Sequence, residues 1–322
     1  MEYRKLIRFG KNSFVVSLPK PWVNQNKLVK GDLIYIEESG PTLILSKKDL
    51  DKPERESEKI INIDGKDLNL IEREVNSAYI RNFRKIVLKG KEIKGRIKEF
   101  QRIIQGLIAL EIMEQTTDSI VAKDFLNMDK VSMDELIRKM DVVSRTMLRE
   151  TITILKEDTY QNINERDEDV NRLYFLLYRS VQYNLENLTK AMKNFKLGAV
   201  DLLSLQYVGH YVEGIADEAK RISRFARLLK LPAKEQEAYE NFMQRVFDFY
   251  SDSMKSVYAK NEEAALKLSL LRRGFNSELS EMEERNKGVE HYGRVVERLR
   301  RLVSHIHHLG WTTLTTSIPH NS

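Results

Sequence analysis

The feature that most constrains the fold is a long run of amphipathic helical sequence between about residues 131 and 319. This region has few glycines and a single proline, Pro232, before Pro319 near the end. Apolar residues recur there at helical spacing in six segments: 133–155, 169–192, 201–229, 234–260, 262–285 and 287–318. Each helix must bury its apolar stripe against others, and three segments before Lys230-Leu231-Pro232 are followed by three after it. We therefore predict an internal duplication, with three-helix bundles over 131–231 and 232–319.

Residues 59–128 have a mixed pattern. Four short segments rich in β-branched residues predict strands, and two segments with apolar residues at helical spacing, 67–80 and 92–107, predict helices. No glycine-rich phosphate loop occurs in this part of the sequence. The pattern predicts a small α/β module without a nucleotide site.

Residues 1–48 predict a small β domain. Leu6–Gly10 and Phe14–Leu18 read as strands around a turn, and a hairpin is expected around Ser39-Gly40-Pro41. Pro19 and Pro21 should end the second strand. Residues 49–58 are charged and lack an apolar period, so we expect a linker. A domain of this size buries little surface alone, which predicts an intertwined homodimer. The fold class is thus multidomain: a small β domain, an α/β module and an all-α region.

The net charge of +6 lies at one end of the chain. Residues 1–30 contain seven Lys or Arg residues and one Glu, whereas the remainder has equal numbers of basic and acidic groups. Basic clusters bind polyanions by releasing condensed counterions from the phosphates. The alternative is an ordinary solvated surface.

Several N-terminal motifs resemble the swapped-hairpin DNA-binding domain of the AbrB/SpoVT family. These are Arg4-Lys5-Leu6, the turn 10–13, Val15–Lys20 and Leu28-Val29-Lys30-Gly31-Asp32. The resemblance implies that two chains interleave their hairpins and that basic side chains of the first strand and turn face DNA. The DNA contacts it implies are Arg4, Lys5, Lys11 and Lys20, with Arg8 and Asn12 as further candidates.

Strand alternation limits this set. Arg4 and Arg8 fall on one face of a strand and Lys5 on the other, so Arg4 and Lys5 cannot both face DNA unless the strand is twisted or bulged. Arg4 suits base reading because of its planar fork, and Lys11 and Lys20 suit backbone phosphates.

The helical region resembles the PhoU family, which has duplicated three-helix bundles, controls phosphate uptake and holds metal clusters with acidic motifs. The match is clearest at 212–222, where Glu213 and Asp217 stand four residues apart on one helix face. The resemblance also implies Asp167, on the preceding helix, as a ligand of a divalent or iron-type metal cluster. His210 stands three residues before Glu213 on the same helix face and is a further candidate ligand. Asn171 replaces the second acid of the other motif. The alternative is an acidic surface stripe in which Lys220 pairs with Asp217.

The corresponding helix of the second bundle departs from the family pattern. Ser304 and His308 stand where acids are expected. His305 and His308 are one turn apart and could hold zinc, but histidines in an amphipathic helix are more often packed or hydrogen-bonded.

Other patterns narrow the class of protein. The chain has no cysteine, no apolar run of the roughly 20 residues that span a membrane and no apolar signal segment, so we expect a cytoplasmic protein. It has no Gly-x-Ser-x-Gly or His-Glu-x-x-His motif, which argues against an enzyme. The sequence predicts a dimeric DNA-binding regulator of phosphate uptake whose bundles sense a metal, phosphate or a partner. Two alternatives stay open: an adaptor that docks onto a phosphate transporter or signalling kinase, and a metal-dependent enzyme.

Overall fold

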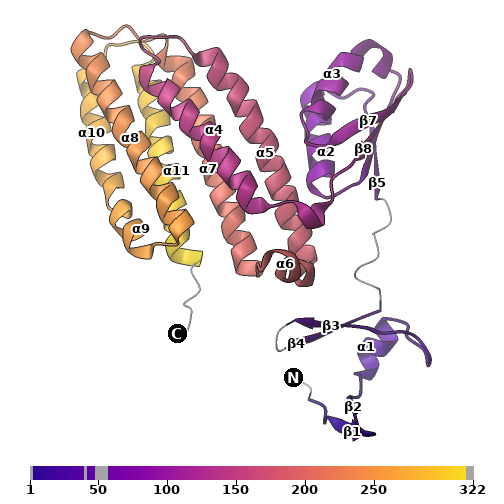
Figure 1. The fold of residues 1–322 in the computed structure, drawn as a ribbon. Coiled ribbons are helices and arrows are strands. Elements are labelled where there is room, and N and C mark those ends of the chain that lie inside the picture. The colour runs from indigo at the N-terminus through magenta and orange to yellow at the C-terminus, as the bar shows by residue number, and fades with distance from the viewer. Residues whose placement is uncertain (1–2, 40–41, 48–56, 317–322) are drawn as a thin grey trace. The chain divides into compact units, whose positions relative to one another are not determined.

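The computed structural model describes residues 3–39, 42–47 and 57–316 (Figure 1). The chain divides into two compact units, Met1–Arg55 and Glu56–Ser322. Most of the predicted linker and the predicted turn residues Gly40 and Pro41 lie outside the described residues. The linker prediction is wrong at its end, because Glu58 already pairs with Lys85 in a sheet.

The first unit contains two separate hairpins and one short helix. β1 (Ile7–Phe9) pairs with β2 (Ser13–Val15), and β3 (Tyr35–Ser39) pairs with β4 (Thr42–Ser46), both antiparallel. Both hairpins were predicted. The helix α1 (Lys20–Gln25) was not, because its two prolines were read only as the end of a strand. Pro19 caps this helix and Pro21 lies in its first turn, where a missing N–H costs nothing.

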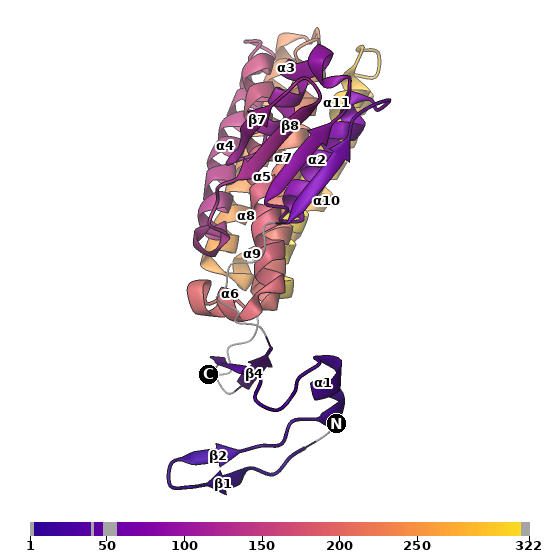
Figure 2. The same cartoon turned by 90° about the vertical axis from the view of Figure 1, so that its right-hand side faces the viewer.

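The second unit begins with the predicted α/β module. Its sheet has the order β5-β6-β8-β7, with β5 and β6 parallel and the other pairs antiparallel. The helices α2 and α3 lie on the side of the sheet that faces the bundles (Figures 1 and 2). The elements are β5 (Glu58–Asn62), α2 (Leu68–Ile80), β6 (Lys85–Lys89), α3 (Ile93–Gln105), β7 (Leu110–Gln115) and β8 (Ser119–Asp124), and a 3-10 turn (Met128–Lys130) leads into the bundles.

The helical region forms two three-helix bundles. The first is built from α4, α5 and α7, and the second from α8, α10 and α11, with short helices α6 and α9 between the long ones. Their bounds are α4 (Met133–Thr153), α5 (Tyr160–Glu186), α6 (Leu188–Phe195), α7 (Ala199–Ala226), α8 (Ala233–Ala259), α9 (Glu262–Ser269), α10 (Leu271–Arg285) and α11 (Tyr292–Thr316).

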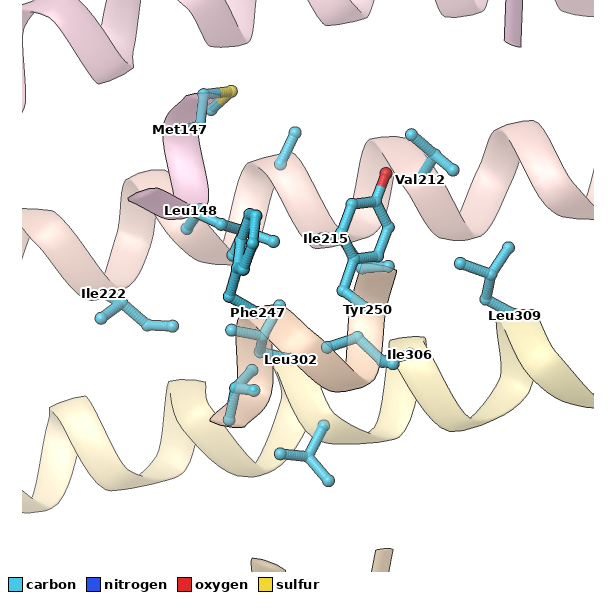
Figure 3. Packing of buried hydrophobic residues seen from close by; sticks show 14 of the residues in the cluster. Met147, Leu148, Val212, Ile215, Ile222, Phe247, Tyr250, Leu302, Ile306 and Leu309 are labelled. Carbon is cyan, nitrogen blue, oxygen red and sulfur yellow. The ribbon is translucent and has the colours of Figure 1, made fainter. Parts of the chain in front are cut away.

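The two bundles share one continuous apolar core. α7 of the first bundle runs beside α11 of the second, and buried side chains of α4 and α8 fill the space next to them (Figure 3). Ile215 and Ile306 lie at the centre of this layer, and neither side chain is exposed to solvent. A perturbation on α7 therefore acts on both bundles.

Three predicted helical segments have wrong boundaries. α5 begins nine residues before the predicted start at 169, because the buried Asp167 occupies an inward position and hides the apolar period that continues through Ile163. The predicted segments 169–192 and 262–285 are each broken in two, at Asn187 and Leu270. α11 begins at 292 rather than 287, because His291 adopts a left-handed conformation that ends the preceding turn.

Candidate functional site

The predicted acidic motif lies on α7 and faces α5. Glu213 and Asp217 are four residues apart on α7, and Asp167 is buried on α5. The structure thus brings together the acidic residues of two helices that are separate in sequence, as the motif predicts.

The ammonium group of Lys220 joins these carboxylates. Its Nζ donates to Oδ2 of Asp167 and lies 3.3 Å from Oδ1 of Asp217. Asn171 Nδ2 also donates to Asp167 at 3.2 Å, and Arg221 Nη2 lies 2.7 Å from Asp217. The pairing of Lys220 with Asp217 is therefore confirmed, but the acids do not form a surface stripe, because Asp167 is buried and also pairs with Lys220.

Burial sets the charge states in this cluster. It raises the pKa of Asp167 above its usual value, although Lys220 opposes that rise. Burial also opposes the charge on Lys220, yet its hydrogen bond and attraction to Asp167 raise the pKa of Lys220. Each of these two groups therefore stabilises the charged form of the other against the cost of burial.

Glu213 is the carboxylate in the cluster without a cation of its own. It makes no ion pair among the described residues, and burial, followed by repulsion from Asp217 and Asp167, raises its pKa to about 7. Glu213 also raises the pKa of Tyr174, although burial is the larger cause. Glu213 is therefore a group that can gain or lose a proton near neutral pH.

The predicted metal ligands do not form a ready-made metal cluster among the described residues. Among residues 3–39, 42–47 and 57–316, no three His, Asp or Glu side chains are gathered closely enough to hold a metal ion. His210 is exposed, and its Nδ1 lies 3.5 Å from the hydroxyl of Tyr174 rather than among the acids. The ammonium group of Lys220 occupies the oxygens that a cation would need.

The histidines of α11 pack as aromatic rings. The ring of His308 stacks on Tyr211 with centroids 5.7 Å apart, and the ring of His305 lies 6.2 Å from the same tyrosine. Burial lowers the pKa of both histidines. Gly214 permits this approach of α7 to α11, because a Cβ at Gly214 would lie 2.9 Å from His305 Cε1. This geometry agrees with the packed alternative for the two residues.

The sequence analysis did not identify two buried charged residues. One forms an ion pair between the two bundles, and the other forms an ion pair between the first bundle and the α/β module. Glu218, next to Asp217, is buried and lies 3.4 Å from Arg298 of α11. Arg179 of α5 is fully buried and lies 2.6 Å from Asp124 of β8. Neither stands out in a chain so rich in charge, although Arg179 falls at an inward position of an apolar helix stripe.

The predicted DNA-binding residues are all exposed in the first unit. Arg8 lies in β1, Lys11 and Asn12 in the turn after it, and Lys20 begins α1. Arg4 and Lys5 precede β1. Gly10 has a φ of +72°, which allows the tight turn that presents Lys11 and Asn12.

Comparison with known proteins identifies the first bundle. Residues 137–226 match the family described as PhoU domain, a span that runs from α4 to the end of α7. This span of the chain therefore matches a PhoU domain. The structure is similar to the crystal structure of PhoU from Pseudomonas aeruginosa, with 13% identity, a TM-score of 0.48, and coverage of 57% of this chain and 94% of that chain. No curated protein matches the sequence significantly. None of the described helices is long and apolar enough to cross a membrane.

Proposed function

We propose that this protein regulates phosphate uptake by binding DNA through its N-terminal unit, with the bundles as the part that responds to an effector. The PhoU domain at 137–226 is the observation that carries the regulatory role. The role is regulatory rather than catalytic in this proposal. DNA binding rests on the N-terminal unit, whose resemblance to AbrB/SpoVT domains stays a prediction.

The N-terminal unit supports a homodimer. Most of its large apolar side chains are exposed in the single chain, including Phe9, which is 70% exposed, and Leu33, which is 76% exposed. A unit with so little buried apolar surface gains stability by covering these side chains with a second copy.

One face of the first hairpin is apolar, and the opposite face carries Arg8 beside Phe14. Ile7 pairs with Val15, so these side chains share a face, while Arg8 alternates to the other face. If the apolar face meets the second copy, Arg8 and the turn residue Lys11 stay available to phosphates. The proposed dimer therefore leaves a basic surface for DNA.

The effector is a separate question. The cluster around Glu213 holds a carboxylate whose pKa is raised to about 7, and we propose that phosphate, a partner protein or a metal acts through the bundles. A metal would have to displace Lys220 from Asp167 and Asp217. Metal analysis of protein purified without chelator, compared with Glu213→Ala, tests that possibility.

The second candidate is an adaptor that docks onto a phosphate transporter or signalling protein through the bundles. The same PhoU domain favours it, and the N-terminal unit would then act only as a dimeriser. This candidate predicts weak DNA binding without sequence preference.

The test is fluorescence anisotropy with duplexes from upstream of phosphate-transport genes and with shuffled duplexes, over a salt series. The variant Arg8→Ala/Lys11→Ala/Lys20→Ala removes three basic groups from the N-terminal unit. The matched control, Lys255→Ala/Lys267→Ala/Lys287→Ala, removes three exposed lysines of the bundles. Each phosphate contact contributes about 0.9 to the slope of log K against log salt, so the first variant should lower the slope by up to about 3 per chain.

Tight binding that prefers the upstream duplex, and is weakened only in the first variant, supports the DNA-binding regulator. Binding that is weak, indifferent to sequence and equal in both variants refutes it and favours the adaptor.

A further inference from the structure

A hollow of about 550 Å³ opens beside α4 and α5, next to the loop between α3 and β7. All its lining residues belong to the unit that begins at Glu56. It is distinct from the cluster around Glu213, with which it shares no lining residue. The lining consists of Ile108, Arg138, Lys139, Val142, Val143, Asp169, Arg172 and Leu173.

The floor of the hollow is apolar. Val142 and Val143 come from α4, Leu173 from α5 and Ile108 from the loop. Val142 is 63% exposed, although a valine in a helix is ordinarily turned toward a core. A concave group of apolar side chains with a few polar groups around it is typical of a small-molecule site, and the volume lies within the range of such sites.

The loop that forms one wall is held in place. The hydroxyl of Tyr79 donates to the carbonyl oxygen of Ile108 at 2.9 Å, and Tyr79 itself is buried in the α/β module. The module and the first bundle therefore build the hollow together.

The rim is positively charged. Three basic side chains and one carboxylate line the hollow. Lys139 makes no ion pair within the described ranges, and Arg172 lies 3.8 Å from Asp169, beyond hydrogen-bond distance. Arg138 is held by Asp134 at 2.9 Å. Lys139 and Arg172 are thus available to an anion.

We propose that this hollow binds a small amphiphilic anion: an apolar body for the valine and leucine floor, and one carboxylate, sulfonate or phosphate group for Lys139 and Arg172. The charge of the rim selects the anion, and the floor selects its apolar body. This proposal does not rest on DNA binding, because every lining residue lies outside the N-terminal unit.

The probe is 8-anilinonaphthalene-1-sulfonate, titrated by fluorescence against the full chain. N-phenyl-1-naphthylamine has the same rings without the sulfonate and is the neutral comparison. Dodecanoate and dodecyl phosphate, added as competitors, distinguish a carboxylate from a phosphate head group. The variants are Lys139→Ala, Val142→Asp and the charge-reversed Val142→Lys, with Lys255→Ala on α8 as the control for loss of a distant lysine.

Exposed apolar side chains of the N-terminal unit can also bind the probe, so the decisive quantity is the component of the fluorescence that Val142→Asp removes. We expect Lys139→Ala to weaken the sulfonate about tenfold, as for the loss of one charge-assisted hydrogen bond. Val142→Asp should abolish this component, and Val142→Lys and Lys255→Ala should retain it.

Three results would overturn the proposal. The first is sulfonate binding that is unchanged in both Lys139→Ala and Val142→Asp. The second is binding of the neutral probe as tight as that of the sulfonate. The third is a change of oligomeric state in Val142→Asp by analytical ultracentrifugation, which would make the hollow an interface between copies.

Discussion

Replacing Arg179 should loosen the α/β module from the first bundle. Its guanidinium is fully buried and lies 2.6 Å from Asp124, while its Nε donates to Asn82 Oδ1 at 2.9 Å. It also lies 4.5 Å from the centre of the Tyr79 ring. Asp124, Asn82 and Tyr79 all belong to the module, whereas Arg179 belongs to α5. This one side chain therefore makes an ion pair, a hydrogen bond and a cation–π contact across the junction.

The magnitude follows from what Arg179→Ala leaves behind. Asp124 is buried, and removing one partner of a buried pair typically costs about 3–5 kcal/mol. Arg84 also contacts Asp124, so the lower end, about 3 kcal/mol, applies. In a unit of this size, 1 kcal/mol shifts Tm by about 2–4 °C, so we expect a loss of about 6–12 °C.

The assay is thermal unfolding of the full chain, combined with hydrogen exchange of the module. The double variant Arg179→Met/Asp124→Leu removes both charges and fills their volume, so it should recover much of the loss. A matched control, Arg172→Ala, removes an exposed arginine from the same helix and should shift Tm by less than about 1 °C. If Arg179→Ala is as stable as this control, or if the double variant is no better than the single one, the junction does not depend on this pair.

Three further predictions concern α7 and its neighbours. The pKa of Glu213 is raised to about 7 from a usual value near 4.5, so the folded state binds the extra proton and loses stability as pH rises between these values. We expect the free energy of unfolding in urea to fall less between pH 4.5 and 8 for Glu213→Gln than for the parent, with a difference of at most about 3 kcal/mol. An equal dependence of this free energy on pH in the two proteins would contradict the raised pKa. Lys220→Met leaves its carboxylate partners without their ammonium group, so calorimetry with Mn²⁺ should detect binding that the parent lacks; no gain would mean that these oxygens do not form a cation site. Gly209→Ala places a methyl group against the buried Leu177, so it should lower the free energy of unfolding in urea by about 1–3 kcal/mol. The control Gly274→Ala meets no neighbouring atom and should raise that free energy by up to about 1 kcal/mol. Similar effects of the two variants would refute the close approach of α7 to α5.

The order of the helices and strands could be predicted from the sequence, because the spacing of apolar residues and the positions of turn residues indicate it. All four strands and both helices of the α/β module were predicted, since each has either alternation or helical spacing between clear breakers. The predicted start of α5 was wrong, because a buried polar residue interrupts the helical spacing of apolar residues there. Asp167 occupies an inward position of α5, so the first turns of that helix read as polar sequence.

The site could be predicted only in part. Spacing placed Glu213 and Asp217 on one helix face, which the structure confirms, and a motif resemblance pointed to Asp167 on another helix. The spacing could not show that Lys220 reaches Asp167. These two residues are 53 positions apart in the sequence and lie on different helices. The packing of His305 and His308 on Tyr211 is likewise a tertiary contact, which a sequence pattern on a single helix does not contain.

The position of α7 determines how a change at Glu213 could reach the second bundle. Gly214, the next residue, lies against the ring of His305 on α11, and Glu218 lies 3.4 Å from Arg298 on the same helix. All three α7 residues lie within two turns, so a proton gained at Glu213 changes the electrostatic field at contacts that join the bundles. Such a change shifts an equilibrium only if the two states of Glu213 favour different packings of α7 against α11. Because α7 packs against both α5 and α11 within one core, a shift of α7 against α5 would also change its packing against α11, and we therefore propose α7 as the element through which an effector would act.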